Sequence, residues 1–101
     1  MKIIAIIPAF NEESTIENII KGTSGFVDEI LVINDGSTDR TKEIAIGSGA
    51  MVIDNIVNRG LGITIKRGHK EALIRGADII VQLDADGQYE PNQSHHVRRG
   101  H

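Results

Sequence analysis

The sequence predicts an α/β fold, a Rossmann-like parallel sheet with alternating helices. Short apolar segments rich in isoleucine and valine alternate along the chain with segments whose apolar residues recur at helical spacing. The apolar segments are continuous, which is typical of parallel strands buried on both faces of a sheet. Polar turns follow three of these segments. This order of strands and helices indicates right-handed crossovers between neighbouring parallel strands.

Local signals at the ends of the segments define the predicted elements. The first strand ends before Pro8, and Asn11 is a candidate N-cap because the two acids after it suit the N-terminal end of a helix dipole. Isoleucines then recur at helical spacing up to Gly22, and Gly76 is expected to end the last helix. The predicted strands are residues 3–7, 29–33, 50–53 and 77–83, and the second and third helices are residues 38–46 and 60–75.

Length and composition exclude several kinds of protein. The chain has 101 residues, 40% of them hydrophobic, which allows one ordinary globular domain. The absence of cysteine excludes a disulfide scaffold, a thiolate zinc site and a cysteine nucleophile. The net charge of −3 and the aromatic content of 3% leave no broad basic surface and no base-stacking platform, so no nucleic-acid partner is expected. The longest apolar run is too short to span a bilayer.

Residues 94–101 interrupt the alternating pattern. They show no period and hold three of the four histidines. A metal-binding or nucleic-acid-binding tail is one interpretation, and a disordered end or an altered reading frame is the interpretation that we favour. We therefore predict one domain over residues 1–93 and an irregular or disordered tail over residues 94–101.

Polar clusters follow three of the predicted strands. They span residues 8–13, 34–39 and 84–88, directly after the first, second and fourth strands. Ligands of open parallel sheets bind beyond the carboxyl ends of the strands, and the fold would bring all three clusters to one rim. This convergence of segments that are distant in the sequence is the main indication of function.

The last cluster is a candidate metal site. Asp84 and Asp86 stand two residues apart at the end of a strand, and Gln88 could add a carbonyl oxygen. Such hard oxygen ligands suit Mg²⁺ or Mn²⁺, which keep positions open for substrate phosphates. With seven aspartates in the chain, chance alone gives about 0.5 Asp-x-Asp pairs, so a solvated turn explains the spacing equally well. The position at the end of a buried strand favours the metal site.

Asp35 and Gly60 are further candidates. An acid at the end of the second strand accepts hydrogen bonds from a ribose or base in nucleotide-binding α/β folds, but an aspartate before Gly36 is also frequent in plain turns. The Gly60-Leu61-Gly62 segment is not a dinucleotide fingerprint, because Ile65 occupies the place of the third glycine. We interpret it as a flexible helix start that lets a phosphate or sugar approach the backbone.

Together these segments resemble glycosyltransferase family 2. The similarity rests on Ile6–Glu13, Val32–Thr41, Asn58–Gly62 and Leu83–Gln88, and it covers residues 2 to about 93. The nearest branch is that of the dolichyl- or polyprenyl-phosphate sugar synthases. The resemblance implies a GT-A fold, the nucleotide-diphospho-sugar transferase fold. It also implies that this chain is the donor-binding part of such a fold, because the family continues well beyond residue 93.

The resemblance further implies roles for individual residues. Pro8, Phe10 and Glu12 would line the nucleotide, and Asp35 would contact its base or ribose. Phe10 stands where the family more usually has tyrosine, and Asn34 stands where it often has aspartate. No catalytic residue is implied within this chain. The residues implied to bind the nucleotide sugar are Pro8, Phe10, Glu12, Asp35, Gly60, Asp84, Ala85 and Asp86, and those implied to hold Mg²⁺ or Mn²⁺ are Asp84, Asp86 and Gln88.

The implied function is metal-dependent transfer of a sugar from a UDP- or GDP-linked donor to a polyprenyl (dolichyl) phosphate or a related acceptor. The implied location is cytoplasmic, with membrane association through the acceptor or through downstream segments. An alternative is a non-catalytic nucleotide- or metal-binding or oligomerisation module, since an uncovered fourth strand favours self-association into a homo-oligomer. A phosphatase with Asp84 as nucleophile and Asp86 as acid is a third option, weakened because such a pair normally follows the first strand.

Overall fold

A computed structural model describes residues 1–85 of the protein and the backbone of residues 95–98. Strands and helices alternate from β1 to β4 as the sequence predicts, which confirms the α/β class. The strands are β1 (Ile3–Ala9), β2 (Glu29–Asp35), β3 (Met51–Asn55), β4 (Ile79–Gln82) and β5 (His95–Arg98), and the helices are α1 (Ile16–Thr23), α2 (Thr41–Gly47) and α3 (Leu61–Ile74).

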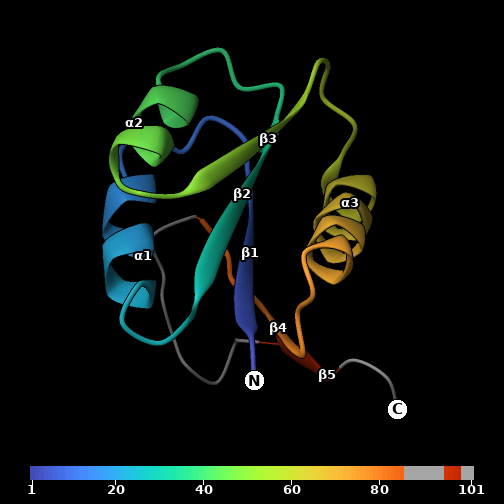
Figure 1. Ribbon diagram of the computed structural model, residues 1–101. Helices are drawn as coiled ribbons and strands as arrows, with labels where there is room; N and C mark the ends of the chain where they lie inside the picture. The colour runs from blue at the N-terminus through green and yellow to red at the C-terminus, as the bar shows by residue number, and fades with distance from the viewer. Residues whose placement is uncertain (86–94, 99–101) are drawn as a thin grey trace.

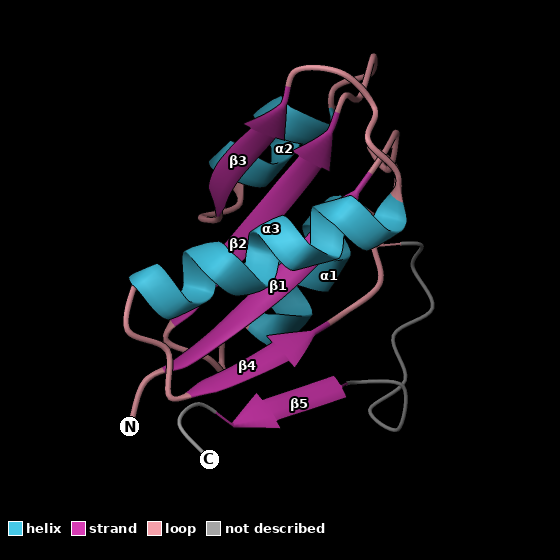
Figure 2. Cartoon of the chain, turned by 90° about the vertical axis from the view of Figure 1, so that its right-hand side faces the viewer, coloured by secondary structure: helices cyan, strands magenta, loops and turns pink. Residues whose placement is uncertain are grey.

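The strands form one sheet in the order β3-β2-β1-β4-β5. Strand β1 pairs in parallel with β2 and β4, and β2 pairs in parallel with β3, whereas β5 runs antiparallel to β4. Helices α1 and α2 cover one face of the sheet and α3 covers the other (Figure 1, Figure 2). Because the chain leaves β1 toward one face and enters β4 from the other, the carboxyl ends of β1 and β4 form a topological switch point.

The core has two layers, one on each face of the sheet. Successive side chains of a strand point to opposite faces, so β1 contributes Ala5 and Ile7 to the layer under α1 and α2. The same strand contributes Ile4 and Ile6 to the layer under α3. All four side chains are fully buried. The prediction of strands buried on both faces is therefore confirmed for β1 and β2, whereas β3 and β4 are mostly half-buried.

Helix α3 packs closely on the sheet because its inner face carries small side chains. Thr64, Gly68 and Ala72 are its buried residues. A Cβ atom on Gly68 would lie 3.1 Å from Cγ1 of Ile33 and 3.2 Å from Cδ1 of Ile6, so these two side chains would have to shift by a few tenths of an ångström to admit it. This contact brings the N-terminal end of α3 close to the end of β2. In the described part of the chain, no helix has both the length and the apolarity needed to cross a bilayer.

The first helix starts later than the sequence predicts. The prediction that Asn11 caps it is wrong, because α1 begins at Ile16 and Thr15 precedes it. Asn11 adopts a positive φ of 53°, and its side-chain oxygen accepts a hydrogen bond from the backbone N–H of Thr38 at 2.8 Å. Since that oxygen is already bound to a different segment, it is not available to a helix that starts at Asn11.

Strand β5 lies inside the segment for which the sequence predicts an irregular tail. The backbone of His95–Arg98 pairs with β4, with Ile79 opposite Arg98 and Gln82 opposite His95. An edge strand presents unpaired N–H and C=O groups. The backbone of another segment can pair with these groups regardless of that segment's side chains. Because β4 is covered in this way, the expectation that an uncovered β4 favours self-association loses its basis.

Candidate functional site

A pocket of about 300 Å³ opens at the carboxyl edge of the sheet, at the switch point. Its walls come from the end of β1 and the turn after it, the end of β2, the N-terminal end of α3 and the segment after β4. The lining residues are Pro8, Ala9, Phe10, Glu12, Asp35, Asn58, Gly60, Leu61, Thr64, Asp84 and Ala85. Every residue predicted to bind the nucleotide sugar within the described ranges therefore lines one pocket. Asp86 and Gln88 lie outside the described residues.

Asp35 connects the end of β2 to the loop before α3. It is only 5% exposed. Its Oδ1 atom accepts hydrogen bonds from the backbone N–H of Arg59 at 2.7 Å and the side-chain amide of Asn55 at 2.9 Å, and its Oδ2 atom accepts one from the N–H of Gly60 at 3.0 Å. Burial raises the pKa of Asp35, but these hydrogen bonds outweigh it and hold the pKa below its ordinary value. The carboxylate is therefore ionised and fixes the loop that forms one wall.

Gly36 allows this loop to lie directly over the end of β2. Its φ is +77°, a conformation that favours glycine, and a Cβ atom at this position would stand 2.7 Å from the backbone N of Asn58. The side-chain amide of Asn58 also donates to the carbonyl oxygen of Asp35 at 3.3 Å. The Asp-Gly pair thus supplies both the hydrogen-bond acceptor and the space that the loop requires.

Asn55 at the end of β3 supports Asp35 from below the pocket. Its side chain is buried, and its amide nitrogen donates to Asp35 and to the hydroxyl of Thr64, at 2.9 and 3.1 Å. Its amide oxygen accepts a hydrogen bond from Nη1 of Arg67, which also donates to the carbonyl oxygen of Asp54. Arg67 offers only donors, so it determines which end of the Asn55 amide faces Asp35.

The structure explains why asparagine stands at position 34. The side-chain amide of Asn34 donates to Oδ1 of Asp54 at 3.0 Å, and its oxygen accepts the N–H of Ser37 at 3.2 Å. Asp54 also pairs with Lys42 at 2.6 Å. An aspartate at position 34 would place two carboxylates against each other and remove a donor. The departure from the more frequent aspartate therefore fits its neighbour on β3.

The turn after β1 is held by the segment before α2. The backbone N–H of Glu12 donates to the hydroxyl of Thr41 at 2.9 Å, and that of Glu13 donates to Oδ2 of Asp39 at 3.2 Å. Burial raises the pKa of Asp39, but hydrogen bonds from the hydroxyl and backbone of Thr41 and from the backbone of Glu13 together outweigh burial. The pKa of Asp39 therefore lies below its ordinary value. These contacts place Phe10, which is 45% exposed, at the mouth of the pocket.

Asp84 lies on the opposite wall from Asp35. The N–H of Leu83 donates to the carbonyl oxygen of Ile6 at 3.0 Å, and the Thr15 hydroxyl donates to the carbonyl oxygen of Ala85 at 2.5 Å. The backbone on both sides of Asp84 is thus attached to β1 and to the start of α1, while its own side chain is exposed. The predicted convergence of the three polar clusters at one rim is confirmed, because residues of all three line the pocket.

The donor set for a divalent cation is partial in the described ranges. No group of three or more His, Cys, Asp or Glu side chains gathers anywhere within them. At the pocket, Asp84 offers an exposed carboxylate on the β4 side and Glu12 lines the β1 side. Mg²⁺ and similar ions are often bound by one or two carboxylates plus substrate phosphates, so an exposed Asp84 beside an open pocket fits such an ion.

Ala9, Asn58, Leu61 and Thr64 line the pocket without having been predicted to bind a ligand. Asn55 was missed too, although it ends a strand with a polar side chain just as Asp35 does. A polar residue that closes an apolar strand was thus an available signal for Asn55. The other positions depend on the path of the loop, which the pattern of apolar residues does not encode.

The fold and the pocket define an α/β protein with an open pocket at the switch point of a parallel sheet. The chain belongs to glycosyl transferase family 2, whose domain matches residues 4–97. Among curated relatives, glucosyl-3-phosphoglycerate synthase of Mycobacterium tuberculosis is 41% identical over 91 residues, which are 80% of this chain and 28% of that protein. UDP-N-acetylglucosamine–dolichyl-phosphate N-acetylglucosaminyltransferase of Methanococcus voltae is 33% identical over 105 residues, covering 86% of this chain and 42% of that protein.

Solved structures show the same fold. The crystal structure of the M. tuberculosis synthase with Mn²⁺ and UDP-glucose superposes with a TM-score of 0.72 and 36% identity, over 84% of this chain and 33% of that one. The fold is therefore that of a GT-A glycosyltransferase, as the sequence predicts. This chain spans between about a quarter and two fifths of the length of these relatives.

Proposed function

We propose that this chain is the donor-binding part of a glycosyltransferase that moves a sugar from a nucleoside diphosphate to an acceptor bearing a phosphate. The observation that carries the proposal is the meeting of Pro8–Glu12, Asp35 and Asp84 in one pocket at the switch point. Each segment is weak evidence by its own sequence, but a donor site accounts for all of them together.

A uridine nucleotide is the donor that the comparisons favour. The M. voltae relative is named for UDP-N-acetylglucosamine, and the M. tuberculosis structure holds UDP-glucose with Mn²⁺. For this chain we propose that Pro8, Phe10 and Asp35 lie along the nucleoside. We further propose that Gly60 lets a phosphate or the sugar of the donor approach the protein backbone closely. GDP-linked donors remain the alternative within the same site.

A polyprenyl phosphate is the acceptor that we propose, and phosphoglycerate is the alternative. Relatives that use dolichyl phosphate include the M. voltae enzyme and dolichol-phosphate mannosyltransferase of Pyrococcus furiosus, which is 34% identical over 99 residues. Both acceptors carry a phosphate, but only in a polyprenyl phosphate is the ionised phosphate oxygen the attacking group. Such an oxygen is already a nucleophile, so the reaction needs no strong general base to activate it.

The reaction breaks the bond between the anomeric carbon and the diphosphate, and negative charge grows on the leaving nucleotide. A divalent ion, held by Asp84 with Asp86 and Gln88, would supply Lewis-acid stabilisation of that charge. The residues of this chain would hold and orient the donor. Asp35 and Gly36 keep the loop of Asn58–Gly60 in place, and Phe10 shields the mouth of the pocket from water.

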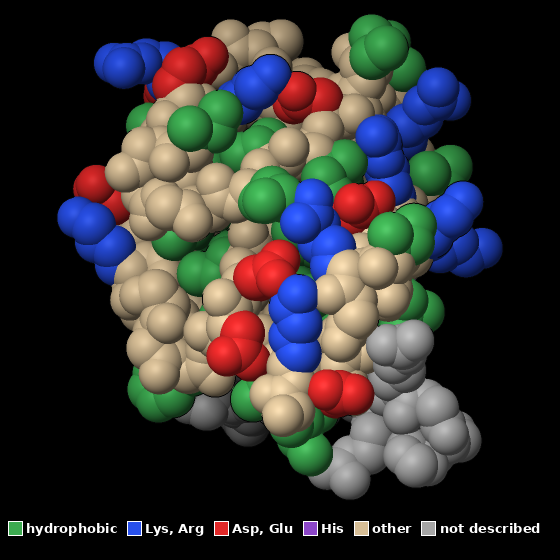
Figure 3. Space-filling view, in the orientation of Figure 1, with side chains coloured by type: hydrophobic (Ala, Val, Ile, Leu, Met, Phe, Trp, Pro, Cys, Tyr) green, Lys and Arg blue, Asp and Glu red, His purple; other side chains and the backbone are tan. Residues whose placement is uncertain are grey.

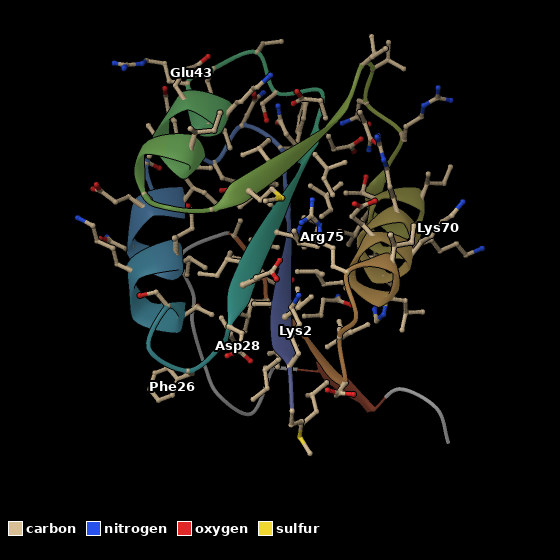
Figure 4. All side chains as sticks on the ribbon, in the orientation of Figure 1. Lys2, Phe26, Asp28, Glu43, Lys70 and Arg75 are labelled. Atoms are coloured by element: carbon tan, nitrogen blue, oxygen red, sulfur yellow. The ribbon has the colours of Figure 1, made fainter. Side chains whose placement is uncertain are left out.

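Calorimetric titration of the 101-residue chain with UDP and Mn²⁺ tests the proposal. We expect saturable binding that depends on the cation. D84N should weaken it by at least about tenfold, because the ion loses one anionic ligand, and D86N should do the same. The matched control is E43Q, which removes a carboxylate from the exposed surface of α2 (Figure 4) at a position that does not line the pocket.

A chain that unfolds cooperatively and yet binds no UDP in the presence of Mn²⁺ would overturn the proposal. Equal affinities of D84N, D86N and the unmodified chain would remove the metal assignment while leaving nucleotide binding in place. UDP binding without sugar transfer would mean that the chain acts as a nucleotide-binding module on its own.

A further inference from the structure

Helix α3 has an outer face that combines aliphatic and basic side chains. We define the α3 outer face as Ile63, Lys66, Lys70, Leu73 and Ile74. Residues 63, 66, 70 and 74 follow the spacing of a single stripe, on the side of the helix away from its buried residues Thr64, Gly68 and Ala72. Ile63, Leu73 and Ile74 are 56%, 42% and 68% exposed, and both lysines are exposed. A surface helix normally shows polar residues on this side.

Among the described residues, the Lys and Arg side chains that form no ion pair concentrate on α3 and the loop before it. Lys2, Lys21, Lys42 and Arg75 each form an ion pair. Within the described ranges no ion pair is formed by Arg59, Lys66, Arg67 or Lys70. Arg40 is the remaining Lys or Arg side chain there without an ion pair. No acid occurs between Asp54 and Glu71, although the whole chain has a net charge of −3. The local surface is therefore positive on an acidic protein.

Basic and hydrophobic side chains gather along the edge of the molecule formed by α3 (Figure 3). The helix covers its face of the sheet alone, so its outer side meets no other element in the described residues (Figure 2). With 14 residues, the helix is about 21 Å long, which gives a narrow but continuous contact strip.

The composition of the strip discriminates between occupants. Two copies of the chain facing each other through the same strip would bring their lysines together, which is unfavourable. Nucleic acid would gain nothing from exposed isoleucine and leucine and would find no aromatic side chain to stack on. A surface of anionic lipid satisfies both components, because aliphatic side chains enter the headgroup boundary while lysines reach the phosphates.

We propose that the α3 outer face docks this protein on an anionic lipid surface. Docking in this orientation brings the N-terminal end of α3, with Gly60 and Leu61 of the pocket wall, to the edge of that surface. The inference goes beyond the proposed function, and it does not require that a nucleotide be bound. It gives a lipid-borne acceptor a short path to the pocket.

Vesicle co-sedimentation of the 101-residue chain tests the inference. We expect binding to vesicles that contain phosphatidylglycerol, weaker binding at high salt, and little binding to pure phosphatidylcholine. K66Q/K70Q should bind about 25-fold more weakly, since each lysine near such a surface contributes about fivefold. I63Q/I74Q should bind at least about tenfold more weakly, because two aliphatic side chains no longer enter the lipid.

Matched controls come from the opposite side of the molecule. K21Q removes an exposed lysine of α1, and F26Q removes a hydrophobic side chain that is 75% exposed and lies far from Lys70 (Figure 4). Both should bind vesicles as the unmodified chain does. Every changed side chain is on the surface, so we expect all four variants to fold. Unfolding curves show whether each of them does.

Three results would each overturn the inference. The first is no binding to anionic vesicles, and the second is binding that both α3 variants retain. The third is a dimer in light scattering that I63Q/I74Q abolishes while vesicles bind nothing, because the strip would then serve a second copy. UDP titration without vesicles tests the proposed function separately. Absence of nucleotide binding would contradict the proposed function, whereas absence of lipid binding would contradict only the inference about the α3 outer face.

Discussion

Gly36 offers the sharpest measure of how the pocket loop is held. In G36A the new Cβ atom would lie 2.7 Å from the N of Asn58 and 3.0 Å from the C of Val57, and both are backbone atoms that cannot rotate away. Its φ of +77° costs an alanine about 1–2 kcal/mol, and displacing the loop costs about 1–3 kcal/mol more. We expect G36A to lower the free energy of unfolding by about 2–5 kcal/mol and to weaken UDP binding.

Gly49 provides the matched control. Its φ is +98°, but a Cβ atom there meets nothing within 4 Å. G49A should therefore cost only the conformational part, about 1–2 kcal/mol, and leave UDP affinity unchanged. Urea unfolding followed by circular dichroism gives both free energies, and calorimetry gives both affinities. Equal losses of stability in the two variants, or UDP affinity unaffected by G36A, would refute the role of the close approach to Asn58.

Helix α3 and the buried acids yield further predictions that the same unfolding assay checks. G62A should raise the free energy of unfolding by about 0.5–1 kcal/mol, because Gly62 is helical and a Cβ atom there meets nothing within 4 Å. G68V should lower it by about 1–3 kcal/mol, since Ile33 and Ile6 occupy the space, and a neutral G68V would contradict the packing described. The pKa values of Asp35 and Asp39 lie below their ordinary value, so their contribution to stability is complete above about pH 4 and is lost as the pH falls through the lower folded-state values. D35N should flatten that acid limb, and an unchanged limb would count against the hydrogen bonds assigned to Asp35.

The sequence was sufficient to predict the four parallel strands and the meeting of the polar clusters. Continuous apolar runs such as residues 3–7 identify strands buried on both faces, and parallel strands place their carboxyl ends at one edge. Pro8, Asp35 and Asp84 could therefore be predicted to approach one another without any knowledge of side-chain contacts. The prediction depended on topology, which the order of the elements determines.

Contacts between side chains and backbone groups distant in the chain could not be predicted from the sequence. Nothing local to Asn11 shows that its oxygen binds the N–H of Thr38, 27 positions away, and this contact is what delays the start of α1. The pairing of His95–Arg98 with β4 was missed for a related reason. Ladder hydrogen bonds use backbone groups that every residue except proline carries, so a segment without apolar alternation can still complete an edge.

The hydrogen bonds of Asp35 are compatible with both interpretations of this residue, as a ligand contact and as a turn former. An ionised carboxylate has about four acceptor positions. The N–H groups of Arg59 and Gly60 and the amide of Asn55 take three of them, and a hydrogen bond from Thr64 takes another. Of these donors only the Thr64 hydroxyl turns about a single bond without moving the backbone or the buried amide. A nucleotide that reaches Asp35 would therefore displace the Thr64 hydroxyl and leave the loop in place, so one carboxylate can shape the wall of the pocket and still accept a ligand.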